Sequence, residues 1–163
     1  MIFDKYTKLV VIGNSGSGKS TVATHVAAAT GISAHDLDLI HWHEDGRKRD
    51  ETESKMLVGQ IASKSSWIIE GVYGWLAEVA LSEATSLIWT DLCWSECRHG
   101  IIQRGLRRGM TFKDQDELIV WAEHYWIRST SSSFAGHQRM YAAFGRAKLR
   151  LNSRAEVSSL IAG

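Results

Sequence analysis

The sequence of 163 residues predicts a single α/β domain in which a parallel sheet lies between two layers of helices. Two observations lead to this prediction. Short apolar runs alternate along the chain with longer segments whose apolar residues recur at helical spacing, and this alternation is typical of right-handed βαβ units. The short runs are apolar at consecutive positions, as expected for strands that are covered on both faces. We therefore expect about five parallel strands in a three-layer arrangement.

The first third of the chain predicts two strands that enclose one helix. Residues 8–12 form a β-branched run that stops at Gly13, and they predict the first strand. Residues 20–29 are alanine-rich and predict a helix, because the glycine that follows, Gly31, suits a helix C-cap. Residues 32–37 predict a weaker second strand that ends in acidic residues.

The middle third continues the alternation. Residues 51–64 and 73–81 predict helices, whereas residues 67–69 and 85–90 predict strands. Residues 41–50 are polar and irregular. An acidic residue follows each of these two strands, so carboxylates are expected at the edge of the sheet where α/β proteins bind their ligands.

The last third adds four predicted elements and one junction. Residues 95–107 predict a helix that bears arginines, and residues 114–128 predict a strongly amphipathic helix. The serines within residues 129–133 indicate a junction between helices. Residues 147–151 predict a fifth strand, and residues 154–161 predict the closing helix.

A glycine-rich motif separates the first predicted strand from the first predicted helix. It reads Gly-Asn-Ser-Gly-Ser-Gly-Lys-Ser and matches the P-loop pattern G-x-x-x-x-G-K-[ST] at every position. Its glycines allow successive backbone N–H groups to point at one anion, and the following helix adds the positive end of its dipole. The lysine supplies a charge to the β- and γ-phosphates, and the last serine is placed to bind Mg²⁺. The predicted nucleotide-binding residues are Gly13, Asn14, Ser15, Gly16, Ser17, Gly18, Lys19, Ser20 and Thr21.

Composition narrows the class of nucleotide-binding protein. The only asparagines are Asn14 and Asn152, so the Asn-Lys-x-Asp motif that reads guanine is absent from the sequence. The formal net charge of +1 gives no broad attraction to nucleic acids or acidic membranes. Two cysteines do not make a disulfide scaffold and favour a cytoplasmic location. A compact ATP-dependent kinase fits these observations best.

With this motif in place, the chain resembles the adenylate-kinase-like group of small P-loop kinases. More narrowly, it is similar to bacterial proteins described as topology-modulation or adenylate-kinase-related P-loop proteins. The segments that carry the resemblance are residues 13–21, 37–42, 67–73, 90–92 and 95–104. The resemblance implies a three-layer P-loop NTPase fold and the use of ATP and Mg²⁺. It also implies a short helical lid near residues 105–128, within one domain that spans residues 1–163.

Three acidic residues are candidate ligands at the ends of the second and third strands. Asp36 and Asp38 form an Asp-x-Asp pair, similar to the pair that serves Mg²⁺ and the acceptor hydroxyl in shikimate and gluconate kinases. By that resemblance Asp36 assists Mg²⁺ through water, and Asp38 orients or deprotonates the acceptor. Glu70 precedes a glycine, as the acidic residue of adenylate kinases does, and is expected to hold hydrated Mg²⁺ together with Ser20. The structural alternatives are a turn capped by one aspartate and a helix capped by Glu70.

A group of arginines follows the fourth strand. Arg104, Arg107 and Arg108 are spaced to share one face of the predicted helix, where like charges are unfavourable unless an anion neutralises them. The resemblance to adenylate kinases assigns Arg104 to phosphate binding and Arg108 to the lid, and Arg128 is a further lid candidate. The alternatives are a solvated basic face and a nucleic-acid patch. The predicted catalytic residues are Lys19, Asp38, Arg104, Arg108 and Arg128, and Arg104 is also expected to bind the nucleotide.

The acceptor side departs from the adenylate-kinase pattern. Those enzymes continue after the third strand with Phe-Pro-Arg, where the arginine grips the acceptor nucleotide. Residues 71–73 read Gly-Val-Tyr instead, and the missing arginine argues against a nucleoside monophosphate as acceptor. Trp42 and Trp75 are expected to line the acceptor pocket, and the histidines and acids within residues 41–45 offer a metal site as an alternative.

The predicted function is Mg²⁺-dependent transfer of the ATP γ-phosphate to a small-molecule acceptor, either a nucleotide or a small hydroxy compound. One alternative is a nucleotide-binding regulatory protein linked to DNA topology, which would bind DNA in a salt-sensitive manner. The other is a plain NTPase that hydrolyses its nucleotide without an acceptor.

Overall fold

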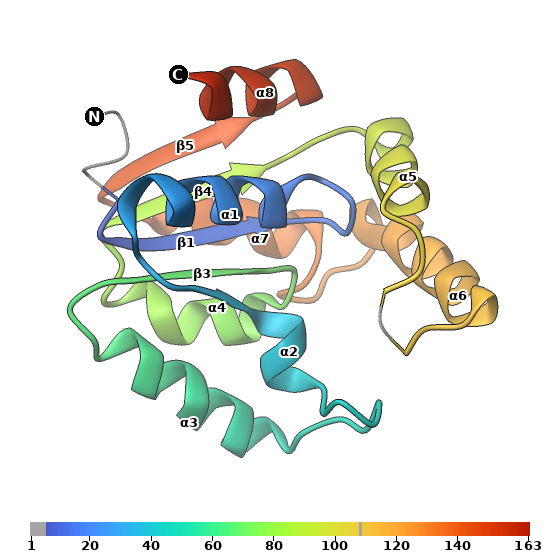
Figure 1. Cartoon of the computed structure of the whole chain (residues 1–163), viewed down its shortest axis with the longest axis horizontal. Helices are drawn as coiled ribbons and strands as arrows, with labels where there is room; N and C mark the ends of the chain where they lie inside the picture. Colours follow the sequence, from blue (N-terminus) through green and yellow to red (C-terminus); the bar gives the residue numbers. More distant parts are fainter. Residues whose placement is uncertain (1–5, 108) are drawn as a thin grey trace.

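A five-stranded parallel sheet forms the centre of the computed structural model, which describes residues 6–107 and 109–163 (Figure 1). The strand order is β2-β3-β1-β4-β5. The strands are β1 (Lys8–Gly13), β2 (Ala34–Asp36), β3 (Trp67–Gly71), β4 (Ser86–Thr90) and β5 (Ala147–Leu151). The predicted number of strands and their parallel arrangement are confirmed.

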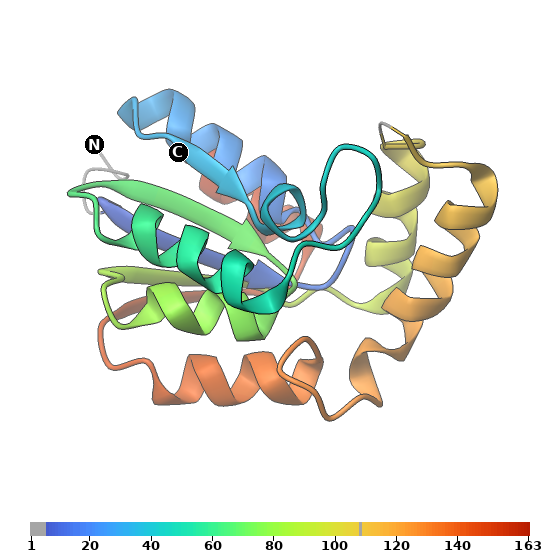
Figure 2. The same ribbon diagram turned by 90° about the horizontal axis from the view of Figure 1, so that it is seen from below.

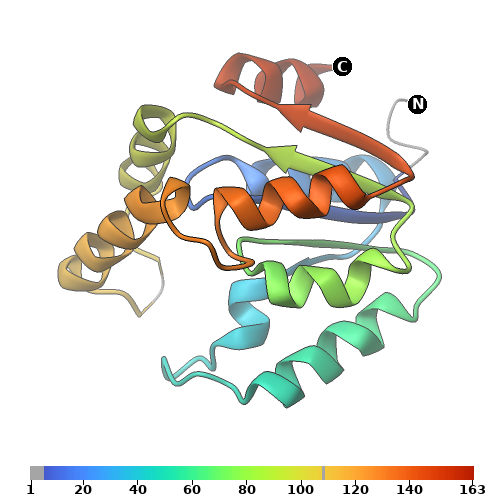
Figure 3. The same ribbon diagram turned by 180° about the vertical axis from the view of Figure 1, so that it is seen from behind.

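The helices form one layer on each face of the sheet and a separate group at its carboxyl edge. They are α1 (Lys19–Thr30), α2 (Leu37–His41), α3 (Glu51–Ala62), α4 (Gly74–Leu81), α5 (Trp94–Gln103), α6 (Phe112–Glu123), α7 (Phe134–Ala143) and α8 (Arg154–Ala162), with a 3₁₀ turn, η1 (His124–Trp126). Helices α1 and α8 cover one face, and α3, α4 and α7 cover the other (Figures 2 and 3). Helices α5 and α6 stand beyond the carboxyl ends of the strands (Figure 2).

The core has two halves because side chains alternate between the faces of a strand. In β1, Val10 and Ile12 pack toward α3, α4 and α7, whereas Leu9 and Val11 pack toward α1 and α8. All four side chains are fully buried. Burial of a side chain of this size contributes about 1.5–3 kcal/mol, so the consecutive apolar residues of this strand stabilise both layers.

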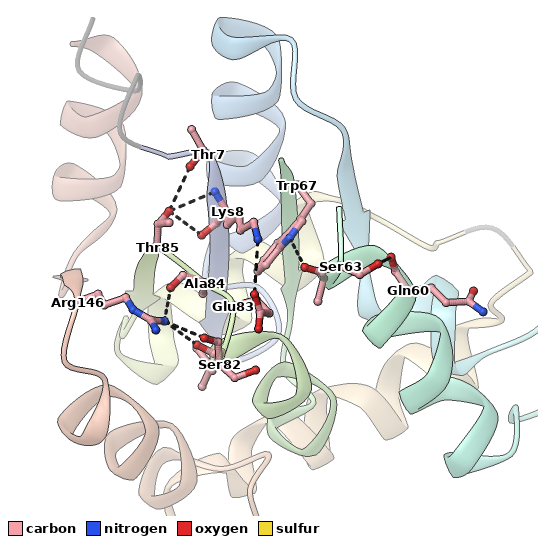
Figure 4. Close-up of polar contacts among 12 residues, drawn as sticks. Thr7, Lys8, Gln60, Ser63, Trp67, Ser82, Glu83, Ala84, Thr85 and Arg146 are labelled. Carbon is pink, nitrogen blue, oxygen red and sulfur yellow. Dashed lines mark hydrogen bonds and ion pairs between the residues drawn. The ribbon is translucent and has the colours of Figure 1, made fainter. Parts of the chain in front are cut away.

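The amino edge of the sheet is closed by hydrogen bonds to the backbone (Figure 4). The Thr85 hydroxyl donates to the Lys8 carbonyl at 3.2 Å. The Arg146 guanidinium donates to the carbonyls of Ser82 and Ala84, at 3.0 and 2.7 Å, just beyond the end of α4. These contacts hold the strand connections at the amino edge together.

The arginine-bearing helix is shorter than the sequence predicts. Helix α5 ends at Gln103, and Arg104 is its C-cap. Gly105 follows with a φ of 70°, in the left-handed region, so the chain turns away from the helix axis. The prediction that the arginines share one helical face is therefore wrong for Arg104 and Arg107, and Arg108 lies outside the described residues.

Two helices were not predicted from the sequence. Helix α2 lies between the predicted strand at residues 32–37 and the polar segment at residues 41–50, and it overlaps each by one residue. The Asp36 side chain caps it by accepting from the Asp38 N–H at 2.8 Å. Helix α7 begins after Ser133, whose hydroxyl accepts from the Gly136 N–H at 3.1 Å. The predicted helix junction at the serine cluster is thereby confirmed. Within the described ranges, no helix combines the length and the apolar character needed to cross a membrane.

A chain of buried hydrogen bonds joins β4, η1, α7 and the loop after β3. The Trp89 indole donates to the Tyr125 hydroxyl at 3.2 Å, and that hydroxyl lies 2.7 Å from Nδ1 of His137. Nε2 of His137 lies 2.9 Å from the Val72 carbonyl. Because a carbonyl only accepts, Nε2 carries the proton, and Nδ1 accepts from Tyr125. Burial lowers the pKa of His137 to about 3, so the ring stays neutral.

His137 predicts a defined loss of stability in acid. Its folded pKa lies below the ordinary value of 6.5, so the unfolded chain binds the extra proton between these two pH values. The contribution of His137 is therefore complete above pH 6.5 and falls toward pH 3, by about 1.4 kcal/mol per pH unit. Denaturant unfolding at pH 7 and pH 4.5 measures this, and the wild type should lose about 2 kcal/mol more than His137→Gln. Equal losses would contradict the assignment of a neutral buried ring.

Candidate functional site

The glycine-rich loop lies between β1 and α1 and rests against α5. Gly16 has a φ of 75°, and a Cβ at this position would overlap the carbonyl oxygen of Cys97. A Cβ on Gly100 would overlap the carbonyl oxygen of Gly16. Arg154 donates to that same carbonyl at 2.9 Å. The loop is therefore fixed by direct contact between two backbones, which only glycine permits at these positions.

Lys19 is a buried cation that lies over this loop. Its Nζ donates to the Asn14 carbonyl at 2.7 Å. Burial lowers the pKa of Lys19, and the carboxylates of Glu70 and Asp38 oppose that shift. The side chain of Asn14 donates to the Ala122 carbonyl at 2.9 Å, so the loop is also tied to the end of α6.

Ser20 and Glu70 meet at the carboxyl edge of the sheet. The Ser20 hydroxyl donates to Oε1 of Glu70 at 2.7 Å. The register of β2 and β3 places Asp36 opposite Glu70, and burial raises the pKa of both carboxyls. A hydroxyl and carboxylate oxygens are the ligands that Mg²⁺ prefers, with water completing its shell, so this group of residues fits a hydrated Mg²⁺ ion.

The alternative metal site at residues 41–45 finds no support. Among the residues that the structure describes, no group of three or more His, Cys, Asp or Glu side chains is arranged to hold a metal ion. His41 is buried among three rings instead, edge-on to Trp42, Tyr73 and Trp75 at centroid distances of 5.7, 5.2 and 5.0 Å. Burial lowers its pKa, as expected for a packed neutral ring.

Arg107, in the segment after α5, forms an ion pair with each aspartate of the Asp-x-Asp pair. Arg107 Nη1 lies 2.5 Å from Oδ2 of Asp38, and Nη2 lies 3.0 Å from Oδ2 of Asp36. Asp36 also caps α2, so the capping alternative and the functional one apply to the same side chain. The sequence placed Arg107 in a basic cluster without a role. Its proximity to the acids depends on the turn at Gly105, which the sequence analysis did not predict.

The other two described arginines of the prediction differ in their surroundings. Burial lowers the pKa of Arg104, and the charge of Arg107 lowers it further. The charges of Asp38, Asp36 and Glu70 oppose that shift, so Arg104 lies within electrostatic reach of the acidic group, and its catalytic role stays a prediction. The Arg128 guanidinium stacks 4.0 Å from the centre of the Trp121 ring. It donates to the backbone carbonyls of Trp121 and Ser132, the latter at 3.0 Å. Arg128 thus braces the base of the predicted lid, and its catalytic role stays a prediction.

Tyr73 lies between the aromatic rings around His41 and the carboxylate of Asp38. The Trp42 indole donates to the Tyr73 hydroxyl at 2.9 Å. Burial, together with the charge of Asp38 and a hydrogen bond to it, raises the pKa of Tyr73 to about 12. The phenol is therefore a neutral hydrogen-bonding group beside Asp38. Tyr73 was not among the predicted site residues, because a tyrosine within an apolar run is equally consistent with core packing.

The contact between the glycine-rich loop and α5 predicts that alanine at Gly100 lowers the free energy of unfolding, whereas alanine at Gly59, outside this contact, raises it. Gly100→Ala places a methyl group on the Gly16 carbonyl and should lower the free energy of unfolding by about 1–3 kcal/mol. Gly59→Ala in α3 is the matched control, because the nearest atom to its Cβ is a Val79 methyl at 4.0 Å. It should raise the free energy of unfolding by up to about 1 kcal/mol. Denaturant titration measures both values, and a neutral Gly100→Ala would show that the close contact is not a constraint.

Comparison with known proteins establishes the fold. No protein-family model matches the sequence, and no curated protein matches it either. A shikimate kinase from Acinetobacter baumannii is 13% identical, with a TM-score of 0.61 over 99% of this chain and 92% of that one. A gluconokinase from Sinorhizobium meliloti 1021 is 16% identical, with a TM-score of 0.56 over 97% and 95%. A sugar kinase from Janibacter sp. HTCC2649 is 18% identical, with a TM-score of 0.55 over 94% and 89%. The chain therefore has the three-layer P-loop fold that these kinases share.

Proposed function

We propose that the protein is a phosphotransferase that moves the γ-phosphoryl group of ATP to a hydroxyl group of a small molecule, with Mg²⁺ as its cofactor. The observation that carries the proposal is the meeting of a phosphate-binding loop and an acidic pair at one edge of the sheet, with Lys19 lying between them. The names of the three similar structures support a small hydroxy compound as the acceptor class, rather than a nucleotide. The Gly-Val-Tyr run at residues 71–73, where adenylate kinases carry Phe-Pro-Arg, supports the same choice.

The nucleotide side of the site is the loop and the start of α1. Backbone N–H groups of residues 13–20 surround the phosphates, and Thr21 continues that turn. Lys19 and Arg104 neutralise the charge that develops on the transferred group. Bound Mg²⁺ would neutralise the β- and γ-phosphate oxygens, and Ser20, Glu70 and Asp36 are the residues that would hold it with its waters.

The acceptor side is built around Asp38. Its carboxylate accepts the proton of the acceptor hydroxyl as the new bond from oxygen to the γ-phosphorus forms. The bond between that phosphorus and the β–γ bridging oxygen breaks, and ADP leaves with the bridging oxygen. Asp38 must first exchange Arg107 for the hydroxyl, which frees the guanidinium to meet the phosphoryl charge. Tyr73, whose hydroxyl accepts from the Trp42 indole, is placed beside the acceptor in this proposal.

Residues 105–128 act as the lid in this proposal. Closing it over the acceptor excludes water, so that the acceptor rather than water receives the phosphoryl group. Arg128 at its base, and Arg108, which lies outside the described residues, are its candidate cations. The proposal includes three further predictions from the sequence. They are a single domain over residues 1–163, a relationship to the topology-modulation proteins and a cytoplasmic location.

The experiment is a transfer assay. The protein is incubated with Mg²⁺, ATP labelled at the γ-phosphate and a panel of sugars, sugar acids, small hydroxy acids and nucleotides. We expect one acceptor class to be phosphorylated, and Lys19→Ala to abolish the transfer. Asp38→Asn should lower kcat by about 10²–10⁴-fold with little change in the affinity for ATP, because it removes the proton acceptor and a partner of Arg107 but leaves the phosphate-binding loop intact.

The matched control is Asp45→Asn, because Asp45 is an exposed aspartate that pairs with Arg47 on a turn. This variant should transfer at the wild-type rate. Hydrolysis of ATP at a rate that no acceptor alters would favour the plain NTPase. Salt-sensitive DNA binding without transfer would favour the regulatory protein.

A further inference from the structure

The segment from Tyr125 to His137, which we call the brace, joins the base of the predicted lid to the loop after β3. Residues 71–75, which run from the last residue of β3 through the loop to the start of α4, are called the acceptor loop. We propose that His137 is a positioning residue, whose hydrogen bond to the Val72 carbonyl sets the place of Tyr73 in the acceptor pocket. The inference rests on the proposed function, because it assigns the residue that shapes the acceptor side of that site.

The brace holds the acceptor loop on both sides of Tyr73. On one side, Nε2 of His137 donates to the Val72 carbonyl at 2.9 Å. On the other side, the Gly74 N–H donates to the Ser132 hydroxyl at 3.2 Å. A Cβ on Gly74 would overlap the Ser131 carbonyl, so the two backbones are in direct contact. Tyr73 therefore has little freedom to shift along the loop.

Tyr73 is the residue of the loop that meets the chemistry. Its hydroxyl accepts from the Trp42 indole at 2.9 Å. It lies close enough to Asp38, the proposed proton acceptor, for that carboxylate to raise the pKa of the phenol. A shift of the loop would move this hydroxyl away from the carboxylate and widen the pocket. Small displacements of this kind weaken the binding of a positioned substrate, because productive geometry tolerates errors well below 1 Å.

The brace is anchored on the nucleotide side as well. Tyr125, which donates to His137, accepts from the Trp89 indole of β4. Just before the brace, the Ala122 carbonyl accepts from Asn14 of the phosphate-binding loop. The phosphate-binding loop and the acceptor loop are thus both hydrogen-bonded to one continuous segment, residues 122–137. This arrangement distinguishes positioning from simple core packing, because packing alone does not require a polar ring that bonds at both nitrogens.

Two amide variants of His137 distinguish the role of its Nε2 from that of its Nδ1. The amide of His137→Gln reaches the place of Nε2 and keeps a donor for the Val72 carbonyl. The amide of His137→Asn is shorter, reaches only the place of Nδ1, and leaves that carbonyl without its donor. Tyr125→Phe is the third variant, since it removes the partner of Nδ1 and spares the bond to Val72. His137→Asn also removes more volume than the other two variants, so a role in packing alone would lower overall stability in the order of lost volume. It would then accelerate amide exchange in β1 as well as in residues 71–77, whereas a positioning role confines the effect to residues 71–77.

The first readout needs no acceptor. Amide hydrogen exchange is followed in peptides covering residues 71–77, with peptides from β1 as the internal control. We expect His137→Asn to accelerate exchange in residues 71–77 by about tenfold or more, the effect of a buried carbonyl that has lost its donor. His137→Gln and Tyr125→Phe should stay close to the wild type there. Equal exchange in His137→Asn and His137→Gln would overturn the inference.

The second readout uses the acceptor that the transfer assay identifies. For His137→Asn the acceptor KM should rise by about tenfold and the ATP KM should change by less than about twofold, with recovery in His137→Gln. A fall in kcat with both KM values unchanged would overturn the inference and leave the proposed function intact. A panel without any phosphorylated acceptor would overturn the proposed function, and the exchange experiment would still decide whether His137 holds the acceptor loop.

Discussion

The burial of the Lys19 ammonium is the constraint on which the rest of the site depends. Its pKa is lowered by burial, and a buried cation is tolerated only with partners. The carboxylates of Glu70, Asp38 and Asp36 supply opposite charge, and Arg104 and Arg107 balance the excess of acids in turn. Separate parts of the fold hold these charges at the carboxyl edge, where Arg107 pairs directly with Asp36 and Asp38. Such a group favours an incoming phosphate chain with a divalent cation, because both signs of charge are already in place.

The order of the strands explains why these charges meet. β1 lies in the middle of the sheet, between β3 and β4, so the loop after β1 has Glu70 on one side and Thr90 on the other. Strand order reverses at this point, which is where open α/β sheets bind their ligands. The pairing of β2 with β3 adds Asp36 beside Glu70. The topology of the sheet therefore determines which charged residues meet at the site. The backbone contact of Gly16 with α5 fixes the glycine-rich loop there.

The sequence predicted those parts of the site that local chemistry determines. The phosphate-binding loop has a fixed spacing and a fixed place between a strand and a helix, and the strand-end acids follow from the same alternation. Arg107 and His137 could not be predicted in this way, because their partners are distant in the sequence. Arg107 pairs with acids that are 69 and 71 residues away, and His137 bonds to a carbonyl that is 65 residues away. Helix α7 was missed because its apolar positions are interrupted by Gly136 and by the buried polar ring of His137. Helix α5 was predicted too long because three arginines at helical spacing outweighed Gly105.

The central claim is that Ser20, Glu70 and Lys19 together bind ATP with Mg²⁺. Isothermal titration with ATP, in the presence and absence of Mg²⁺, tests it directly in the wild type and in Glu70→Gln. The account predicts that Mg²⁺ tightens ATP binding in the wild type, and that Glu70→Gln loses this gain and keeps its affinity for ATP alone. An equal gain in both proteins, or no binding of ATP by the wild type, would contradict it.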